Sequence, residues 1–323
     1  MKKRFLVAAM AAAMVSPLAA FADATVYGNI HLSIDDFDDD NSATTEELDM
    51  NSNTSAIGVK GKEDLGGGMS ALFKAEFQID PSERNNNITD RDQWVGLKGA
   101  FGTVKFGTMS SNYKQMGGKI DPMYRTQLEG RNGNYAGQSN LHSGAGIYRG
   151  RSTNTVQYTS PKMSGVTVVF NTTISGSNEE TMGLGVRYKT KNILAYFDYI
   201  DMDKDFNDAT DTGTESAMKV GGSFKTGAIT LGLQHELTGD LLGEDTTFLS
   251  ANYQMNDNDN IAFTFASASE ESAGSGNDGS AYALMYNHNM SKRTNVYVGY
   301  GISDIDDNDT DVTDLTFGIR HKF

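Results

Sequence analysis

A strict alternation of apolar and polar residues runs through most of this chain and limits what it can fold into. The clearest example is the segment 69–80, where Met, Ala, Phe, Ala, Phe and Ile share one face. The other face carries Ser, Leu, Lys, Glu, Gln and Asp, with Leu72 as the only apolar exception. A period of two predicts a β-strand with two unlike faces. Such strands fit either a soluble sandwich or a barrel, and the direction of the charged face decides between them.

The alternation recurs in sixteen segments, separated by short turns and by longer acidic loops. The segments are 25–34, 57–62, 69–80, 92–98, 103–108, 153–158, 166–171, 182–189, 193–200, 217–225, 229–237, 246–254, 261–267, 281–288, 295–302 and 312–323. Short turns on one side and long loops on the other are typical of outer-membrane barrels. The sequence therefore predicts an all-β, transmembrane antiparallel β-barrel of sixteen strands, with fourteen or eighteen as alternatives. A secreted soluble β protein is the simpler reading of the same alternation.

Residues 1–22 have the pattern of a secretory signal peptide. Three basic residues precede a short apolar run, and residues 20–22 form an A-x-A cleavage site. We therefore expect an exported mature chain, residues 23–323, that forms one barrel domain. The signal holds three of the 27 basic residues, so the mature chain has 24 basic and 42 acidic residues and a net charge of −18. This excess of acid argues against nucleic acid as a partner. Cysteine is absent, so disulfides contribute nothing.

The insert from Ser110 to Gly150 is the one long stretch that does not alternate. It is glycine-rich and too long for an ordinary connection, and loops of this length are usually functional or disordered. Its charge is opposite to that of the chain, because five basic residues face only two acidic ones. The basic residues are Lys114, Lys119, Arg125, Arg131 and Arg149, and the acidic ones are Asp121 and Glu129.

The last strand places Leu315, Phe317, Ile319 and the terminal Phe323 on one face. A terminal aromatic residue at this spacing resembles the assembly signal of outer-membrane barrel proteins, which predicts the barrel-assembly machinery as a partner of the C-terminal strand. Five stretches carry a more specific resemblance, in this order along the chain: TVYGNI, IGVKGKEDLGGGMSALFKAEFQ, RDQWVGLKGAFGTVKFGT, NTVQYTSPKMSGV and FGIRHKF. With these stretches the chain resembles the Gram-negative porin family of trimeric general-diffusion porins.

The resemblance implies a sixteen-stranded barrel, a homotrimer in the bacterial outer membrane, and a third outer loop that folds inward to narrow the pore. Two departures concern the pore itself. Ala56 stands where the second strand of such porins commonly has an arginine that faces the lumen, and the insert is not rich in acid. Both departures put the charge at the constriction in question, but not the fold.

We interpret the insert, residues 110–150, as the constriction loop of a water-filled channel. Opposed charges across a narrow passage order water and set ion preference. The predicted constriction residues are the loop carboxylates Asp121 and Glu129 and seven basic residues: Lys60, Lys74, Arg91, Arg125, Arg131, Arg149 and Arg151. Each of these charges could equally be solvated, with little effect on flow.

The expected function is passive diffusion of ions and small hydrophilic solutes through the outer membrane. The acidic loops at 35–49, 201–211 and 304–314 favour cations at the mouth, and the basic insert opposes this over the short range that screening allows. The balance predicts a weak preference for cations. The alternatives are a substrate-specific channel and, with less support, a barrel enzyme or adhesin.

Three short motifs do not support an enzymatic or metal-binding function. The glycine pattern at 274–279 has no following helix, and the pair at 235–236 lacks the second histidine of a zinc site. Asp201, Asp203 and Asp205 begin like a calcium loop, but Phe206 replaces its glycine and Thr212 its closing glutamate. We therefore expect no catalytic residues, no metal and no cofactor.

Overall fold

The computed structural model describes most of the mature chain. The described ranges are 23–39, 47–83, 88–131, 138–142, 150–174, 181–203, 214–239, 244–270, 278–305 and 310–323. The predicted signal peptide, Arg149, Asp205 and most of the glycine pattern at 274–279 lie outside these ranges.

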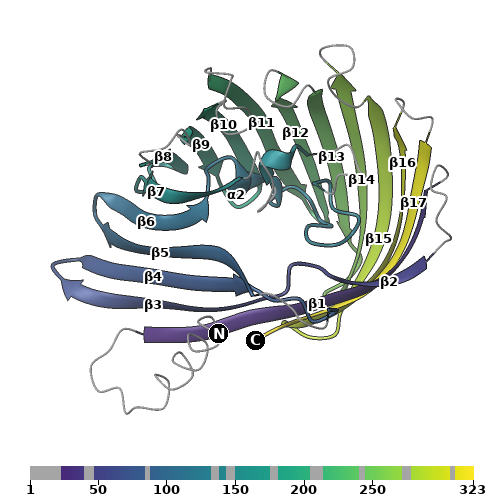
Figure 1. The fold of residues 1–323 in the computed structure, drawn as a ribbon, viewed down its shortest axis with the longest axis horizontal. Helices are drawn as coiled ribbons and strands as arrows, with labels where there is room; N and C mark the ends of the chain where they lie inside the picture. Colours follow the sequence, from purple (N-terminus) through teal and green to yellow (C-terminus); the bar gives the residue numbers. More distant parts are fainter. Residues whose placement is uncertain are drawn as a thin grey trace.

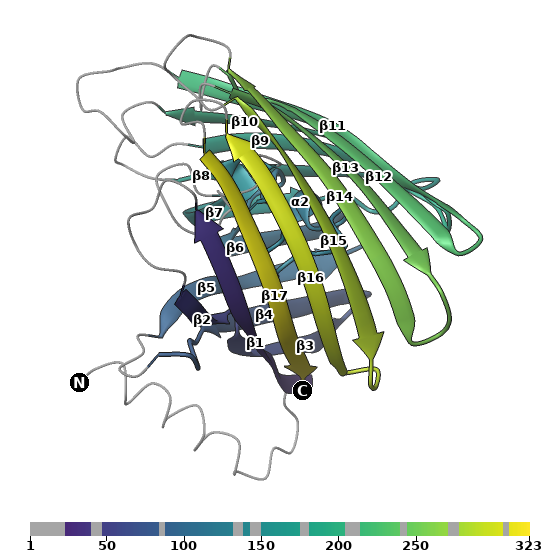
Figure 2. The same cartoon turned by 90° about the vertical axis from the view of Figure 1, so that its right-hand side faces the viewer.

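One antiparallel sheet forms nearly all the regular structure and closes on itself into a barrel (Figure 1). Its segments are β1 (Asp23–Asp39), β2 (Glu47–Ser52), β3 (Ala56–Gly66), β4 (Met69–Gln78), β5 (Thr89–Gly99), β6 (Gly102–Ser110), β7 (Arg151–Thr159), β8 (Val166–Thr173), β9 (Thr181–Lys189), β10 (Ile193–Asp203), β11 (Thr214–Thr226), β12 (Ile229–Leu237), β13 (Glu244–Gln254), β14 (Asp259–Glu270), β15 (Gly279–Asn289), β16 (Thr294–Ile305) and β17 (Thr310–Lys322). The barrel closes because β1 pairs with β17. Figure 2 shows the strong tilt of the strands that closure requires.

The second position of the barrel is split into two segments. Both β2 and β3 pair with β1, β2 along residues 32–37 and β3 along residues 23–29. Residues 53–55 leave the ladder between them, and Thr54 has a positive φ of 58°. Counted by position around the barrel, the seventeen segments therefore make sixteen strands, which confirms the predicted number.

The two faces of the wall differ in polarity. On β12, Gln234 and Glu236 are fully buried on the inner face, whereas Leu231 and Leu233 on the outer face are 48% and 52% exposed. The same contrast recurs along the other strands. Because the exposed face is the apolar one, the wall suits lipid outside and polar groups inside. This decides the question that the alternation left open, in favour of a transmembrane barrel over a soluble sandwich.

The acidic stretches near the first and last strands are partly strand. β1 continues through Asp39, and β17 begins at Thr310. Asp35 and Asp314 are consequently buried on the inner face, at 3% and 2% exposure. The prediction of a loop at 35–49 was wrong for residues 35–39, which belong to β1. Asp314 lies in β17, within the strand predicted at 312–323, although it was also counted among the acids of the loop at 304–314. The alternation continues there, but acidic residues fill the positions that are polar elsewhere.

The insert between β6 and β7 lies inside the barrel, against the inner face of the wall (Figure 1). Its described parts are residues 111–131 and 138–142, which include the one-turn helix α2 (Lys114–Gly117) and a 3-10 turn, η1 (Asn140–His142). None of the helices in the described residues is long and apolar enough to cross a membrane.

Candidate pore constriction

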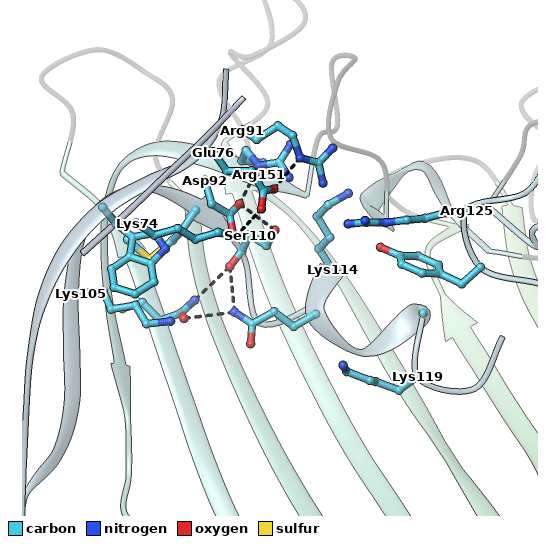
Figure 3. Close-up of a pocket in the computed structure, with 16 residues that line it drawn as sticks. Lys74, Glu76, Arg91, Asp92, Lys105, Ser110, Lys114, Lys119, Arg125 and Arg151 are labelled. Atoms are coloured by element: carbon cyan, nitrogen blue, oxygen red, sulfur yellow. Dashed lines mark hydrogen bonds and ion pairs between the residues drawn. The ribbon is translucent and has the colours of Figure 1, made fainter. Parts of the chain in front are cut away.

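A polar cavity of about 340 Å³ separates the insert from the wall formed by β4–β7 (Figure 3). Seven basic side chains and two carboxylates line it. They are Lys74, Arg91, Lys105, Lys114, Lys119, Arg125 and Arg151, with Glu76 and Asp92. Figure 3 shows the three cations of the insert facing the charged cluster on the wall. The cavity is therefore strongly basic.

Two irregularities in the wall aim charged residues at the cavity. The pairing of β4 with β5 shifts between Ala75 and Phe77, and the pairing of β6 with β7 shifts between Gly107 and Met109. Bulges of this kind redirect side chains and often lie beside functional sites. The shift between β4 and β5 leaves Arg91 and Asp92 opposite Glu76, and both of these consecutive residues line the cavity, which strict alternation would forbid.

The wall side of the cavity is a network of ion pairs. Arg91 Nε donates to Glu76 Oε1 at 2.6 Å, and Lys74 Nζ lies 3.0 Å from Glu76 Oε2. The Lys74 ammonium also reaches Asp92 Oδ2 at 3.1 Å, and Arg151 Nε donates to Asp92 Oδ1 at 2.9 Å. Each carboxylate is thus shared by two cations. The network fixes these side chains in place and leaves the wall with an excess of positive charge.

The insert side carries cations without a carboxylate of its own at the cavity. Lys119 and Arg125 line the cavity, and the Arg125 side chain lies 5.5 Å from the Tyr124 ring centroid. Lys114 Nζ donates to the main-chain carbonyl of His142. Burial, together with the charge of Arg131 and other nearby cations, holds the pKa of Lys114 well below its usual range.

The two predicted loop carboxylates lie within the insert instead of lining the cavity. Asp121 is 5% exposed, and its oxygens accept the main-chain N–H groups of Met123 at 2.8 Å and Gly130 at 3.0 Å. Burial and the nearby charge of Glu129 raise the pKa of Asp121 to about 7. Glu129 accepts the Arg125 N–H at 2.7 Å and pairs with Arg131 Nε at 2.6 Å. These carboxylates hold the loop together.

The remaining predicted residues divide between the cavity and its surroundings. Lys74, Arg91, Arg125 and Arg151 come together there, as described above. Lys60 is exposed on the inner face of β3, 4.8 Å from the Tyr27 ring centroid, and is not part of the lining. Arg131 lies 4.6 Å from the Tyr124 ring centroid, within the insert.

Sequence reasoning did not select five of the charged residues that line the cavity. Glu76, Asp92 and Lys105 sit in ordinary alternating strands, and Lys114 and Lys119 are two of several basic residues in the insert. Only the polar face of β4 gave a signal for Glu76. No group of three or more potential metal ligands occurs in the part of the chain that the structure describes.

Comparison with known proteins identifies the family. The family model for Gram-negative porins matches residues 8–308. The chain belongs to the Gram-negative porin family. Its relatives include the major outer membrane protein P.IB of Neisseria gonorrhoeae, 29% identical over 208 residues. That match covers 60% of this chain and 56% of the relative, so the chain spans little more than half the length of the relative it matches.

Solved structures share the fold of this porin. An anion-selective porin from Comamonas acidovorans aligns with a TM-score of 0.77 at 19% identity, covering 94% of this chain and 100% of the other. Salmonella typhi OmpF, solved in complex with daunomycin, aligns with a TM-score of 0.74 at 13% identity, covering 94% and 98%. The fold and the family together place this porin in the bacterial outer membrane.

An apolar pad on the wall holds the insert of this porin in position. The insert contributes four buried side chains to it: Met116, Ile120, Met123 and Leu128. The wall contributes Tyr196, Phe248, Ala262, Ala266, Ala281, Ala283, Met285 and Tyr297, from β10 and β13–β16. The four small alanines leave room that the larger side chains of the insert fill. Close packing of this kind fixes the loop by excluding water from its underside.

Glycines on the inner face let the insert approach the wall. A Cβ on Gly183 of β9 would lie 2.0 Å from Asn112 Oδ1, and one on Gly299 of β16 would lie 2.6 Å from Leu128 Cδ1. On β12, a Cβ on Gly232 would lie 3.1 Å from the carbonyl oxygen of Ile120. Glycine inside a strand often marks a close approach of this kind.

Proposed function

We propose that this porin forms a water-filled channel for passive diffusion of ions and small hydrophilic solutes across the outer membrane. One observation carries the proposal: a basic cavity remains between the insert and the β4–β7 wall, inside a closed barrel whose outer face is apolar. Sixteen strands enclose a lumen wide enough for water, and the insert narrows it. The outward apolar face implies membrane lipid as its surroundings, and the C-terminal strand is proposed as the signal for the barrel-assembly machinery.

We further propose that the constriction prefers anions. The weak cation preference expected from the sequence rests on acidic loops at the mouth, and it stays untested. Two of those acids, Asp35 and Asp314, are buried in the wall, and screening over roughly 8–10 Å limits the reach of the others. At the cavity, basic side chains outnumber carboxylates by seven to two. The structural neighbour from Comamonas acidovorans is described as anion-selective, which agrees with this proposal.

Planar-bilayer recordings test both steps. Discrete conductance steps from the purified, refolded protein support the channel, and their absence in a correctly folded sample contradicts it. In a KCl gradient, a reversal potential of the sign set by chloride supports anion preference. A reversal potential of the sign set by potassium restores the cation preference expected from the sequence.

The free edge of β2 supports a homotrimer. Within the described residues, the strand registers pair β2 with β1 alone, along residues 32–37, so its second edge has no strand partner there. Leu48 and Met50 on this segment are 72% and 55% exposed. An open edge beside exposed apolar side chains favours association with another chain. Light scattering of the detergent-solubilised protein gives the number of chains per particle, and a monomer in a mild detergent contradicts the trimer.

A substrate-specific channel is the second candidate. The cavity combines ion-paired arginines with the Trp94 and Tyr124 side chains, which suits an organic acid better than a sugar. Citrate, acetate and a neutral disaccharide added separately to single channels discriminate the two. Current block by micromolar citrate favours a specific channel, whereas block only at high millimolar concentration favours general diffusion.

A further inference from the structure

The carboxylate of Glu236 joins both ends of the insert to the barrel wall. Glu236 faces inward from β12 and is fully buried. Its oxygens accept hydrogen bonds from Tyr113 Oη at 2.9 Å and from Ser139 Oγ at 2.7 Å. His142 Nε2 lies 3.2 Å from both oxygens, and Gln234 Nε2 donates at 2.7 Å. Tyr113 belongs to the outgoing limb of the insert (residues 111–120), and Ser139 and His142 belong to its return limb (residues 138–142).

The two limbs depend on Glu236 to different degrees. The outgoing limb has a second anchor, because Asn112 bonds Asn171 Oδ1 at 2.8 Å and Asp198 Oδ1 at 3.0 Å. In the described part of the return limb, the hydrogen bonds to the wall go to Glu236, from the main-chain N–H and Oγ of Ser139 and from His142 Nε2. Loss of the Glu236 carboxylate therefore removes the main wall anchor of the return limb and spares the outgoing one.

The return limb in turn positions cations near the cavity. The main-chain carbonyl of His142 accepts hydrogen bonds from Lys114 Nζ and from Arg131 Nη1, the latter at 3.3 Å. Lys114 lines the cavity, whereas Glu236 does not. A displacement of the return limb would free the Lys114 side chain and change the width and the charge of the passage.

The charges around Glu236 suit a fixed anion at this place. Lys219 on β11 is 1% exposed, donates to the main-chain carbonyl of Tyr113 and lies 4.0 Å from the Tyr113 ring centroid. Burial and the charge of Lys219 lower the pKa of His142 to about 4, so its ring is neutral near pH 7. A neutral ring that donates through Nε2 leaves Nδ1 as the acceptor, and Nδ1 has no hydrogen-bond partner among the described residues. Such fully desolvated, charge-assisted hydrogen bonds are costly to break singly.

We propose that Glu236 is a positioning residue of the pore. Its hydrogen bonds to Ser139 and His142, which we call the clasp, hold the return limb of the insert against the wall, and the return limb in turn positions Lys114 at the constriction. This inference rests on the proposed channel function. It also assigns a role to Glu236, which in the sequence stood out only as part of the pair 235–236, an incomplete zinc motif.

Cysteine labelling tests the clasp without measuring current. The chain has no cysteine, so a single introduced thiol reports one site. Gln138→Cys reports the return limb, and Ser111→Cys reports the outgoing limb; these positions are 7% and 1% exposed.

When Glu236→Gln is added, we expect maleimide labelling at 138 to be about tenfold faster, as the loss of one charge-assisted hydrogen bond implies. Labelling at 111 should stay slow. Equal rates at 138 with and without the Glu236→Gln substitution would overturn the clasp.

Matched variants separate positioning from general damage to the barrel. Asp314→Asn is the control, because Asp314 is also a buried inner-face carboxylate and has no hydrogen bond to the described part of the insert. Tyr113→Phe and Ser139→Ala remove one donor each. If Glu236→Gln fails to fold, these two replace it, and Ser139→Ala should speed labelling at 138 more than Tyr113→Phe does. Equal labelling at 138 in both variants and in the wild type would contradict the proposal.

Bilayer currents complete the test. We expect Glu236→Gln to open to a larger conductance with more open-channel noise, while Asp314→Asn stays at the wild-type level. Unchanged conductance and ion preference in Glu236→Gln, with faster labelling at 138, would overturn the link to Lys114. If the wild type conducts no ions but labelling depends on Glu236, the clasp stands and the channel function fails.

Discussion

Phe323 and Gly28 exchange two main-chain hydrogen bonds, each 3.1 Å long, and so join the end of the chain to its first strand. A Cβ on Gly28 would lie 2.5 Å from the Phe323 ring and 2.6 Å from the carbonyl oxygen of Ala56. The terminal ring therefore occupies the space that glycine leaves empty, at the seam where the barrel closes.

Substitution at this seam should impair closure of the barrel. Gly28→Val is expected to reduce the refolded fraction severalfold, because its side chain cannot share the space with the Phe323 ring. Heat-dependent mobility on SDS gels measures the folded fraction. Phe323→Tyr, which keeps the ring and the main chain, should fold like the wild type. Normal folding of Gly28→Val would show that the ring can move aside.

Neutralising one cation of the insert should weaken the anion preference. Lys119→Gln removes one unit of charge that lines the cavity without an ion-pair partner in the described residues. A unit charge about 6 Å from a passing ion in water contributes roughly 0.7 kcal/mol. Because it attracts chloride and repels potassium, its removal changes their difference by about 1.4 kcal/mol, and the chloride-to-potassium permeability ratio should fall about tenfold. Reversal potentials in a KCl gradient give this ratio.

Asp121→Asn provides the matched comparison, since Asp121 lies in the insert but outside the cavity lining. We expect its permeability ratio to equal that of the wild type. A shift as large as that of Lys119→Gln would return Asp121 to the role of constriction carboxylate that the sequence suggested.

Asp121 should also make stability depend on pH. Its pKa is raised to about 7 in the folded protein, from an ordinary value of 3.8, by burial and by Glu129. The folded state binds the proton more tightly than the unfolded state. Its contribution is therefore full below pH 4 and is lost as the pH rises to about 7, by at most about 4 kcal/mol.

Urea unfolding in lipid vesicles between pH 4 and 8 measures this dependence. His142 gives the opposite slope, because its lowered pKa of about 4 makes stability rise between pH 4 and 6.5. The difference between the wild type and Asp121→Asn isolates the aspartate. That difference should become less favourable to the wild type as the pH rises, and a constant difference would contradict the buried, protonated carboxyl.

Truncation of the apolar pad should loosen the insert without opening the barrel. Leu128 is 1% exposed and packs between the insert and the wall. Leu128→Ala is expected to cost about 2–5 kcal/mol of local stability and to increase open-channel noise. Leu231→Ala, the same change on the outer face where Leu231 is 48% exposed, should leave the current unchanged. Equal noise in both variants would argue against a docked insert.

The wall of this protein is predictable from its sequence, but the seating of the insert is not. Alternation of period two is local, so it revealed the strands and their faces, including the polar face that carries Lys74 and Glu76. It failed at Asp35, where an acidic side chain at a buried position looks like a loop residue. It also missed the break at 53–55, because the hydrogen bonds that hold this segment are made to distant residues, such as His31.

The constriction was harder to predict than the wall, because its geometry depends on contacts across the barrel. Charge alone marked Asp121 as a lumen residue, yet the main chain of the same loop satisfies both of its oxygens. Conversely, nothing local distinguishes Glu236 from other polar residues on an alternating strand. Its role follows from Tyr113 and Ser139, which are 123 and 97 positions away in the chain.

The apolar pad has a consequence for how solutes travel. Because the insert is packed against β10 and β13–β16, the charged cavity lies off-centre, beside β4–β7. The two halves of the wall then have different roles: one half contacts the passing solutes, and the other half supports the insert. Substitutions of the inner alanines of β14 and β15 should alter the stability of the docked insert. Substitutions on the inner face of β4–β7 should alter which molecules enter the cell.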